Sequence, residues 1–367
     1  MSVINFSALR TPLLPLLVFI PLGLVLSHQG QGNNPLIVFL VNGLAIVPIA
    51  QIISQSVEQI AEHLGDNWGG ILNATLGNLV ELVIAFSALT SGLYEIVLDS
   101  MVGGLVTNLL LVLGMAALFG GLKNRSLPFK AKTALLNSKL LLAVVLVSFV
   151  PGILDHLNQF DSKQSHEQYS IILSFALLVF YALSFVFQFS IPKDVVSNDS
   201  LPVDIVELDQ SKNNNTFLIG PLIVLSISTL ALVFSSEALV EALTATARKF
   251  NLSDFFTGVF LLPIFGSAAE FVVSLRAAQR NRMDLAIAST IGSSVQIVLF
   301  ILPALVLVGA YIGKPLGIFF SPQAMVAVLV AVFSVEWVCS DGELDWFEGS
   351  FLLMVYLLLL ISSFYLL

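Results

Sequence analysis

Charged side chains are scarce in this chain of 367 residues. They make up 11% of the sequence, whereas apolar residues make up 57%, and the mean hydropathy is +0.96. A soluble domain carries about 25% charged residues. The composition therefore excludes an ordinary soluble protein and predicts a chain embedded in a lipid bilayer.

Basic residues, histidine and cysteine are all few. Lysine and arginine number 15 against 24 aspartates and glutamates, a net charge of −9, so nucleic acid is not an expected partner. Cys339 is the single cysteine, and no intramolecular disulfide can form. The four histidines form no His-Glu-x-x-His motif, and none lies near Cys339 in sequence. We therefore expect no enzymatic activity and no cofactor.

Long apolar runs are abundant. Because about 20 apolar residues cross a bilayer as a helix, these runs predict an all-α polytopic membrane protein with eleven transmembrane helices. No small-residue cleavage site follows the first run, so we interpret that run as a retained helix. The predicted spans are 12–27, 36–63, 68–91, 95–120, 132–152, 168–190, 216–249, 254–279, 283–311, 323–338 and 346–366.

The longest polar break, residues 191–215, holds five aspartates and glutamates. It divides the chain into residues 1–190, the first helix with an N-terminal repeat, and residues 216–367, a C-terminal repeat. Basic residues between the spans gather on the side that holds the N-terminus, which predicts that this side and the acidic linker are cytoplasmic. The linker serves either as a solvated connection or as a segment that gathers cations.

Two short motifs recur across this break. GNLVE at 77–81 corresponds to GSAAE at 266–270, and GLVTN at 104–108 corresponds to GSSVQ at 292–296. One predicted helix precedes two sets of five, and an odd number of spans places the second repeat upside down relative to the first. Such inverted five-helix repeats are a recurrent plan for secondary transporters, which hold their substrate where the repeats meet.

The first motif of each repeat ends in a glutamate, Glu81 or Glu270, within apolar surroundings. A charge at membrane depth costs about 2.5–3.5 kcal/mol on insertion scales, so such residues usually face the protein interior and mark an ion path. Ca²⁺ takes six to eight oxygen ligands, and two carboxylates neutralise its charge. The segments contain no thiol or imidazole, which disfavours soft metals. A hydrogen-bonded structural role is the alternative for each glutamate.

Protons compete for the same two carboxylates. When the cation leaves, like-charge repulsion in a site of low dielectric increases their affinity for H⁺. Glu81 and Glu270 are therefore the predicted proton-coupling residues as well as metal ligands. Glu58 and Glu237, late in two long spans, are candidates for an accessory ion path or for structural roles.

The two motif regions resemble the Ca²⁺/H⁺ (cation/proton) exchanger family of the Ca²⁺/cation antiporter superfamily. GNLVELVIAFSALTSG with TNLLLVLG is similar to the first signature region of that family, and GVFLLPIFGSAAEFVV with RMDLAIASTIGSSVQIVLFILP and GKPL is similar to the second. The resemblance implies a metal site formed by Glu81, Glu270, Asn78, Asn108, Gln296 and Ser267. Ser267 stands where the family commonly has asparagine, and its shorter side chain still offers an oxygen.

The resemblance further implies antiport of Ca²⁺ against H⁺ by alternating access, with both ions as substrates. A Na⁺-coupled Ca²⁺ exchanger is the alternative, but such exchangers typically carry proline where this chain has Val80 and Ala269. An ion channel is a third interpretation. The compact chain with short tails favours a bacterial plasma membrane over a vacuolar one, and the sequence leaves a homo-oligomer open.

Overall fold

The computed structural model describes residues 13–28, 34–157, 163–190 and 218–365. The predicted acidic linker, 191–215, lies outside these residues. The helices before it are η2 (Leu14–Val18), α1 (Phe19–His28), α2 (Pro35–Leu76), α3 (Leu79–Thr90), α4 (Tyr94–Val106), η4 (Thr107–Val112), α5 (Leu113–Asn124), α6 (Ala131–His156) and α7 (Lys163–Ser190).

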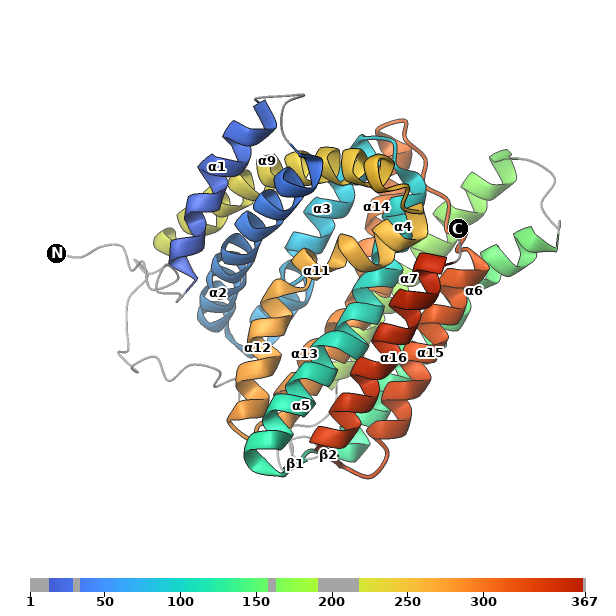
Figure 1. Cartoon of the computed structure of the whole chain (residues 1–367). Helices are drawn as coiled ribbons and strands as arrows, with labels where there is room; N and C mark the ends of the chain where they lie inside the picture. Colours follow the sequence, from blue (N-terminus) through green and yellow to red (C-terminus); the bar gives the residue numbers. More distant parts are fainter. Residues whose placement is uncertain (1–12, 29–33, 158–162, 191–217, 366–367) are drawn as a thin grey trace.

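The second half repeats this helical character (Figure 1). Its helices are α9 (Ile219–Phe250), α10 (Asp254–Phe256), η5 (Thr257–Leu261), α11 (Pro263–Gly266), α12 (Ala268–Gln279), α13 (Met283–Gln296), η6 (Ile297–Ile301), α14 (Leu302–Tyr311), α15 (Pro322–Val338) and α16 (Trp346–Tyr365). Among these elements η4, η5 and η6 are π-helical turns inside longer helices, and such turns are frequent at functional sites.

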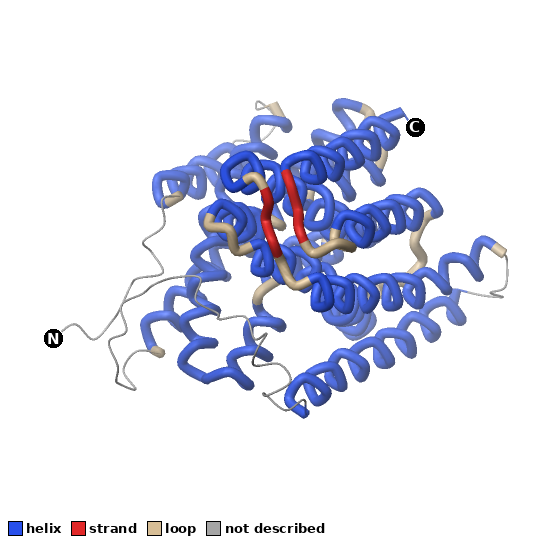
Figure 2. Tube along the Cα trace, turned by 90° about the horizontal axis from the view of Figure 1, so that it is seen from below, coloured by secondary structure: helices blue, strands red, loops and turns tan. Residues whose placement is uncertain are grey.

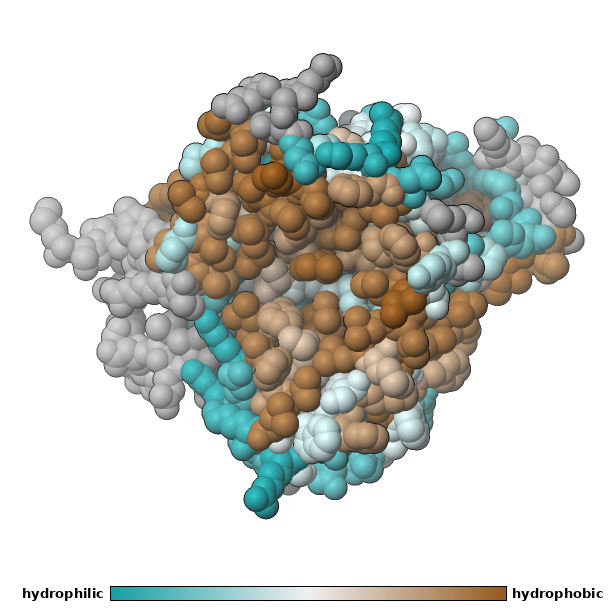
Figure 3. All heavy atoms as spheres, viewed as in Figure 1, coloured by the Kyte–Doolittle hydropathy of each residue, from teal (hydrophilic) through white to brown (hydrophobic). Residues whose placement is uncertain are grey.

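The predicted all-α polytopic fold is confirmed. In the part of the chain that the structure describes, eight helices are long and apolar enough to cross a membrane, and a bent pair makes a ninth. The other two predicted spans correspond to shorter apolar helices, Leu14–Ser27 and Pro322–Val338, so the number eleven stays a prediction. The face shown in Figure 3 is largely hydrophobic, with hydrophilic residues toward its upper and lower edges.

Glycine divides the longest helix into two spans. Gly65 has a φ of 78°, which interrupts α2, and the resulting spans are Pro35–Gly65 and Trp68–Thr90. A positive φ is readily available to glycine and costly for other residues. The predicted boundaries at 36–63 and 68–91 agree with this division.

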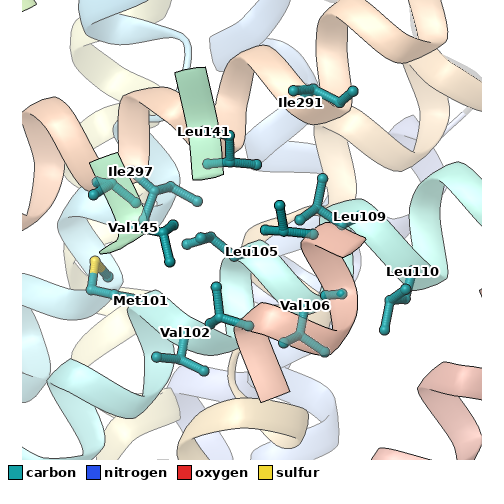
Figure 4. Packing of buried hydrophobic residues seen from close by; sticks show 14 of the residues in the cluster. Met101, Val102, Leu105, Val106, Leu109, Leu110, Leu141, Val145, Ile291 and Ile297 are labelled. Atoms are coloured by element: carbon teal, nitrogen blue, oxygen red, sulfur yellow. The ribbon is translucent and has the colours of Figure 1, made fainter. Parts of the chain in front are cut away.

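The buried apolar residues form two large clusters. The larger one joins α4, η4, α6, α13 and η6, and Figure 4 shows part of it, including Leu105, Leu109 and Ile297. The smaller one joins α2, α3 and α9, and it includes Phe265 of α11. Helices α1, α2 and α9 lie against one another as a layer, and the smaller cluster packs this layer onto α3, α11 and α12.

A two-stranded antiparallel sheet closes one end of the bundle (Figure 2). Strand β1 (Ser126–Pro128) pairs with β2 (Glu343–Asp345), and Leu127 lies opposite Leu344. Both leucines are fully buried. This sheet, which the sequence analysis did not predict, links the α5–α6 connection to the α15–α16 connection.

Candidate functional site

Both candidate glutamates lie at the start of a helix that follows a break within the membrane. Helix α3 starts after Asn78 and carries Glu81 at its third position. Helix α12 starts after Ser267 and carries Glu270 at its third position. The bend at Ser267 is 61°. Free N–H groups at a helix start favour negative charge, so both breaks can accommodate an ionised carboxylate.

The sequences at the two breaks resemble N-terminal helix caps, but their side chains do not make the capping hydrogen bonds. Asn-x-x-Glu and Ser-x-x-Glu fit the capping-box pattern, in which the first side chain accepts a backbone N–H. Within the described helices, however, neither Asn78 nor Ser267 makes a side-chain cap hydrogen bond. Both polar side chains are therefore available for other interactions.

The two carboxylates are buried and close to one another. Glu81 is 8% exposed and Glu270 is 7% exposed, and their negative charges repel each other. The side chain of Glu81 also reaches the break in the other half of the chain. The Cβ that an alanine would have at Gly266 would lie 3.5 Å from Glu81 Cγ and 4.0 Å from Glu81 Oε1. The structure thus brings together the two predicted residues.

A hydrogen-bonded network of polar side chains joins the two halves beside the carboxylates. Asn78 Nδ2 donates to Gln296 Oε1 at 2.7 Å. Ser293 Oγ donates to Asn78 Oδ1 at 2.6 Å, and Asn108 Nδ2 donates to Ser293 Oγ at 3.2 Å. Three predicted site residues therefore meet in this network. Ser293, which is not among the six predicted site residues, connects Asn78 to Asn108.

Several buried oxygen atoms of the site have no hydrogen-bond partner within the described part of the chain. They are Glu81 Oε1, Glu270 Oε2, Asn108 Oδ1 and Ser267 Oγ. A buried acceptor without a donor is costly, and a bound cation or a proton on the carboxylate would reduce that cost. These oxygens come from both halves, as a site between repeats requires.

The chemistry of the site is that of oxygen ligands alone. Among the described residues, no group of three or more His, Cys, Asp or Glu side chains is suited to a metal ion. Glu81 and Glu270 supply two charges, and the polar side chains predicted beside them offer neutral oxygens. Such a set fits a hard divalent cation such as Ca²⁺.

The two predicted accessory residues differ in their surroundings. Glu58 is half-buried on α2, and Glu62 is its like-charged neighbour. Glu237 is exposed on α9. Their role in an ion path stays a prediction.

One buried carboxylate was missed by the sequence analysis. Asp99 on α4 is 8% exposed, and the acidic groups near it belong to Glu95 and Asp254. A Cβ added at Gly258 would lie 2.5 Å from the Cβ of Asp99. Position 258 therefore requires glycine for η5 to pack this closely against α4. The available signal was an aspartate inside the apolar run YEIVLDSMV.

Comparison with known proteins identifies relatives over most of the chain. The sodium/calcium exchanger protein family matches residues 34–190 and 220–365. A Ca²⁺/H⁺ antiporter of Aphanothece halophytica is 33% identical, and the match covers 95% of each chain. A Ca²⁺/H⁺ antiporter of Synechocystis sp. is 36% identical, with 96% of each chain covered.

Solved structures show the same fold. The structure of native YfkE superimposes with a TM-score of 0.81 at 29% identity, covering 96% of this chain and all of that one. The H⁺/Ca²⁺ exchanger CAX gives a TM-score of 0.72 at 15% identity, covering 99% of this chain and 93% of that one. The second likeness concerns the fold alone.

Proposed function

The chain belongs to the sodium/calcium exchanger protein family, and we propose that it is a secondary active antiporter that exchanges Ca²⁺ for H⁺. The observation that carries this proposal is the pair of buried carboxylates, Glu81 and Glu270, one from each half and with unpartnered oxygens beside them. Two relatives that match nearly the full chain bear the name Ca²⁺/H⁺ antiporter.

The ligand set combines charged and neutral oxygens. Glu81 and Glu270 provide the charge, while Asn108 Oδ1 and Ser267 Oγ provide neutral oxygens that are free of hydrogen bonds in the described structure. The amide oxygens of Asn78 and Gln296 already accept a hydrogen bond each. Asn78 and Gln296 therefore position the site in this conformation, and each amide oxygen keeps a second lone pair for a cation.

Competition between the two ions follows from the same carboxylates. A Ca²⁺ ion neutralises both charges, and protons do so when Ca²⁺ leaves. Since one site cannot hold both kinds of ion, occupancy is mutually exclusive, as coupled exchange requires. Each unit of pH difference supplies about 1.4 kcal/mol per proton, and the two carboxylates can carry up to two protons per Ca²⁺ ion.

Alternating access would require movement where the smaller apolar cluster packs α2 and α9 onto α3, α11 and α12. We propose that residues 1–190 and 216–367 contain inverted repeats and that the layer of α1, α2 and α9 moves relative to the bundle that holds the site. Phe265, beside the break in the second half, stacks edge-on against Phe39 of α2 at 5.5 Å. Its ring also lies against Gly43. This contact connects the layer to the site.

Vesicles reconstituted with the purified protein test the proposal. An imposed pH gradient, acidic on the Ca²⁺-free side, should drive Ca²⁺ uptake in the absence of Na⁺, with protons leaving in exchange. Protein-free vesicles serve as the control. Uptake that requires a Na⁺ gradient would show a Na⁺-coupled exchanger instead, and electrical current without counterflow would show a channel.

A further inference from the structure

Ser293 occupies the centre of the network between the two halves. Its hydroxyl donates to Asn78 Oδ1 at 2.6 Å and accepts from Asn108 Nδ2 at 3.2 Å. Of the side chains that fit here, a small hydroxyl is suited to both tasks because it is at once a donor and an acceptor. Ser293 is 6% exposed, so both hydrogen bonds are shielded from water.

These two hydrogen bonds determine how the side-chain amides of Asn78 and Asn108 are oriented. Asn78 is held at both ends, because its Nδ2 donates to Gln296. Asn108 is held at Nδ2 alone, and its Oδ1 has no partner within the described structure. The hydroxyl of Ser293 thus determines that Asn108 offers an oxygen, and not an NH₂ group, to its surroundings.

We propose that Ser293 is a positioning residue for Ca²⁺ binding, which acts by holding Asn108 with its oxygen available to the cation. The inference rests on the proposed function. Without the hydroxyl, Asn108 Nδ2 loses the acceptor that holds it, so the amide is free to turn and to present its NH₂ group in place of its oxygen. A turned amide would direct a positively polarised group toward the cation and would remove one neutral oxygen from the ligand set.

The first-half motif has no hydroxyl at the position that corresponds to Ser293. Its counterpart in the first-half motif is Leu105, which cannot form hydrogen bonds. The hydroxyl link therefore exists on one side of the site only. On the other side, the counterpart of Asn78 is Ser267, whose hydroxyl has no partner in the described structure.

The neighbouring serine provides a matched control. Ser294 is fully buried on the same helix, but its hydroxyl donates to Thr290 O of that helix at 2.8 Å. Ser293→Ala and Ser294→Ala remove the same chemical group at adjacent positions. Only the first removes the link between the halves.

Ca²⁺/H⁺ exchange kinetics of these variants in reconstituted vesicles test the proposal. Ser293→Ala, which removes both hydrogen bonds of the hydroxyl, should raise the KM for Ca²⁺ roughly tenfold, the equivalent of about 1.4 kcal/mol. The maximal rate should stay within about twofold, since the carboxylates that carry the exchange remain. Ser293→Thr, which keeps the hydroxyl, should restore the wild-type KM, and Ser294→Ala should leave it unchanged.

Two outcomes would overturn the positioning role. One is a wild-type KM in Ser293→Ala; the other is an equal rise in Ser294→Ala. Should Ser293→Ala fail to fold, Ser293→Cys has nearly the same shape with a weaker donor and acceptor, and a wild-type KM in that variant would also overturn it. Absence of Ca²⁺/H⁺ exchange in the wild type would instead refute the proposed function, so the two failures are distinguishable.

Discussion

Asn78 donates a 2.7 Å hydrogen bond to Oε1 of Gln296, which lies 218 positions later in the chain. Asn78 precedes helix α3, three residues before Glu81, and Gln296 ends helix α13. The amide pair therefore ties the break that positions one carboxylate to the other half of the protein. The position of Glu81 therefore depends on how the two halves of the protein pack against each other.

We expect Asn78→Ala and Gln296→Ala to be coupled. Each variant should raise the KM for Ca²⁺, because each frees the break before Glu81. The double variant should be less impaired than the sum of the two single effects, with a coupling of about 1 kcal/mol for one shared hydrogen bond. A double-mutant cycle of Ca²⁺ uptake measures this value. Strict additivity would mean that the hydrogen bond between the two amides does not contribute to binding.

Glu81→Gln and Glu270→Gln should each abolish exchange while the protein still folds. Glutamine has nearly the same shape, but it removes one of the two charges and cannot carry the exchanged proton. Uptake of radioactive Ca²⁺ driven by a pH gradient should fall to the level of protein-free vesicles. Glu241→Gln, at an exposed position on α9, is the matched control and should remain active. Exchange that persists in either buried variant would exclude that glutamate from the site.

Gly266→Ala should weaken Ca²⁺ binding with little effect on folding. Its methyl group would lie 3.5 Å from Glu81 Cγ, an ordinary contact that nevertheless fills space beside the carboxylate. We expect the KM for Ca²⁺ to rise about fivefold, or about 1 kcal/mol. Gly70→Ala, where nothing lies within 4 Å of the new methyl, should leave it unchanged. Equal values of KM in the two variants would show that the space beside Glu81 is not used by the ion.

Gly103→Ala should destabilise the folded protein more than Gly104→Ala. A methyl group at position 103 would lie against Val259 O and 2.5 Å from Pro263 Cγ, whereas at position 104 it would meet the flexible end of Ile297 at 2.9 Å. Because backbone cannot move aside as a side chain can, the first substitution should cost about 1–3 kcal/mol. Thermal unfolding of the detergent-solubilised proteins compares them. Similar midpoints would contradict the close packing of α4 on η5 and α11.

Much of this fold could be predicted because each membrane-spanning segment must be apolar and helical. Every predicted span has a helix in the described structure, since a run of apolar residues in a bilayer must satisfy its backbone internally. The pairing of Glu81 with Glu270 was predictable for a different reason. Charges at membrane depth usually mark an ion path, so two carboxylates at corresponding repeat positions predict one site in which a cation or protons neutralise both.

Other features depend on tertiary contacts that leave no periodic signal. The pairing of β1 with β2 joins segments more than 200 residues apart, and three-residue strands are too short for an alternating pattern. The role of Ser293 depends on the partners of its hydroxyl. Ser294 is the same residue type, but its hydroxyl donates to a carbonyl oxygen of its own helix. Asp99 lies in an otherwise apolar run that also holds Glu95, and the second repeat has no acidic residue at the position that corresponds to Asp99.

Proton release on Ca²⁺ binding tests most directly whether Ca²⁺ and H⁺ compete for Glu81 and Glu270. Purified protein in weakly buffered detergent solution should release protons into the medium when Ca²⁺ is added, and its apparent affinity for Ca²⁺ should fall as the pH is lowered, because protonated carboxylates are poor ligands. The fall should approach tenfold per pH unit for each proton displaced. Glu81→Gln and Glu270→Gln should release fewer protons. Tight Ca²⁺ binding that is independent of pH and releases no protons would contradict the account.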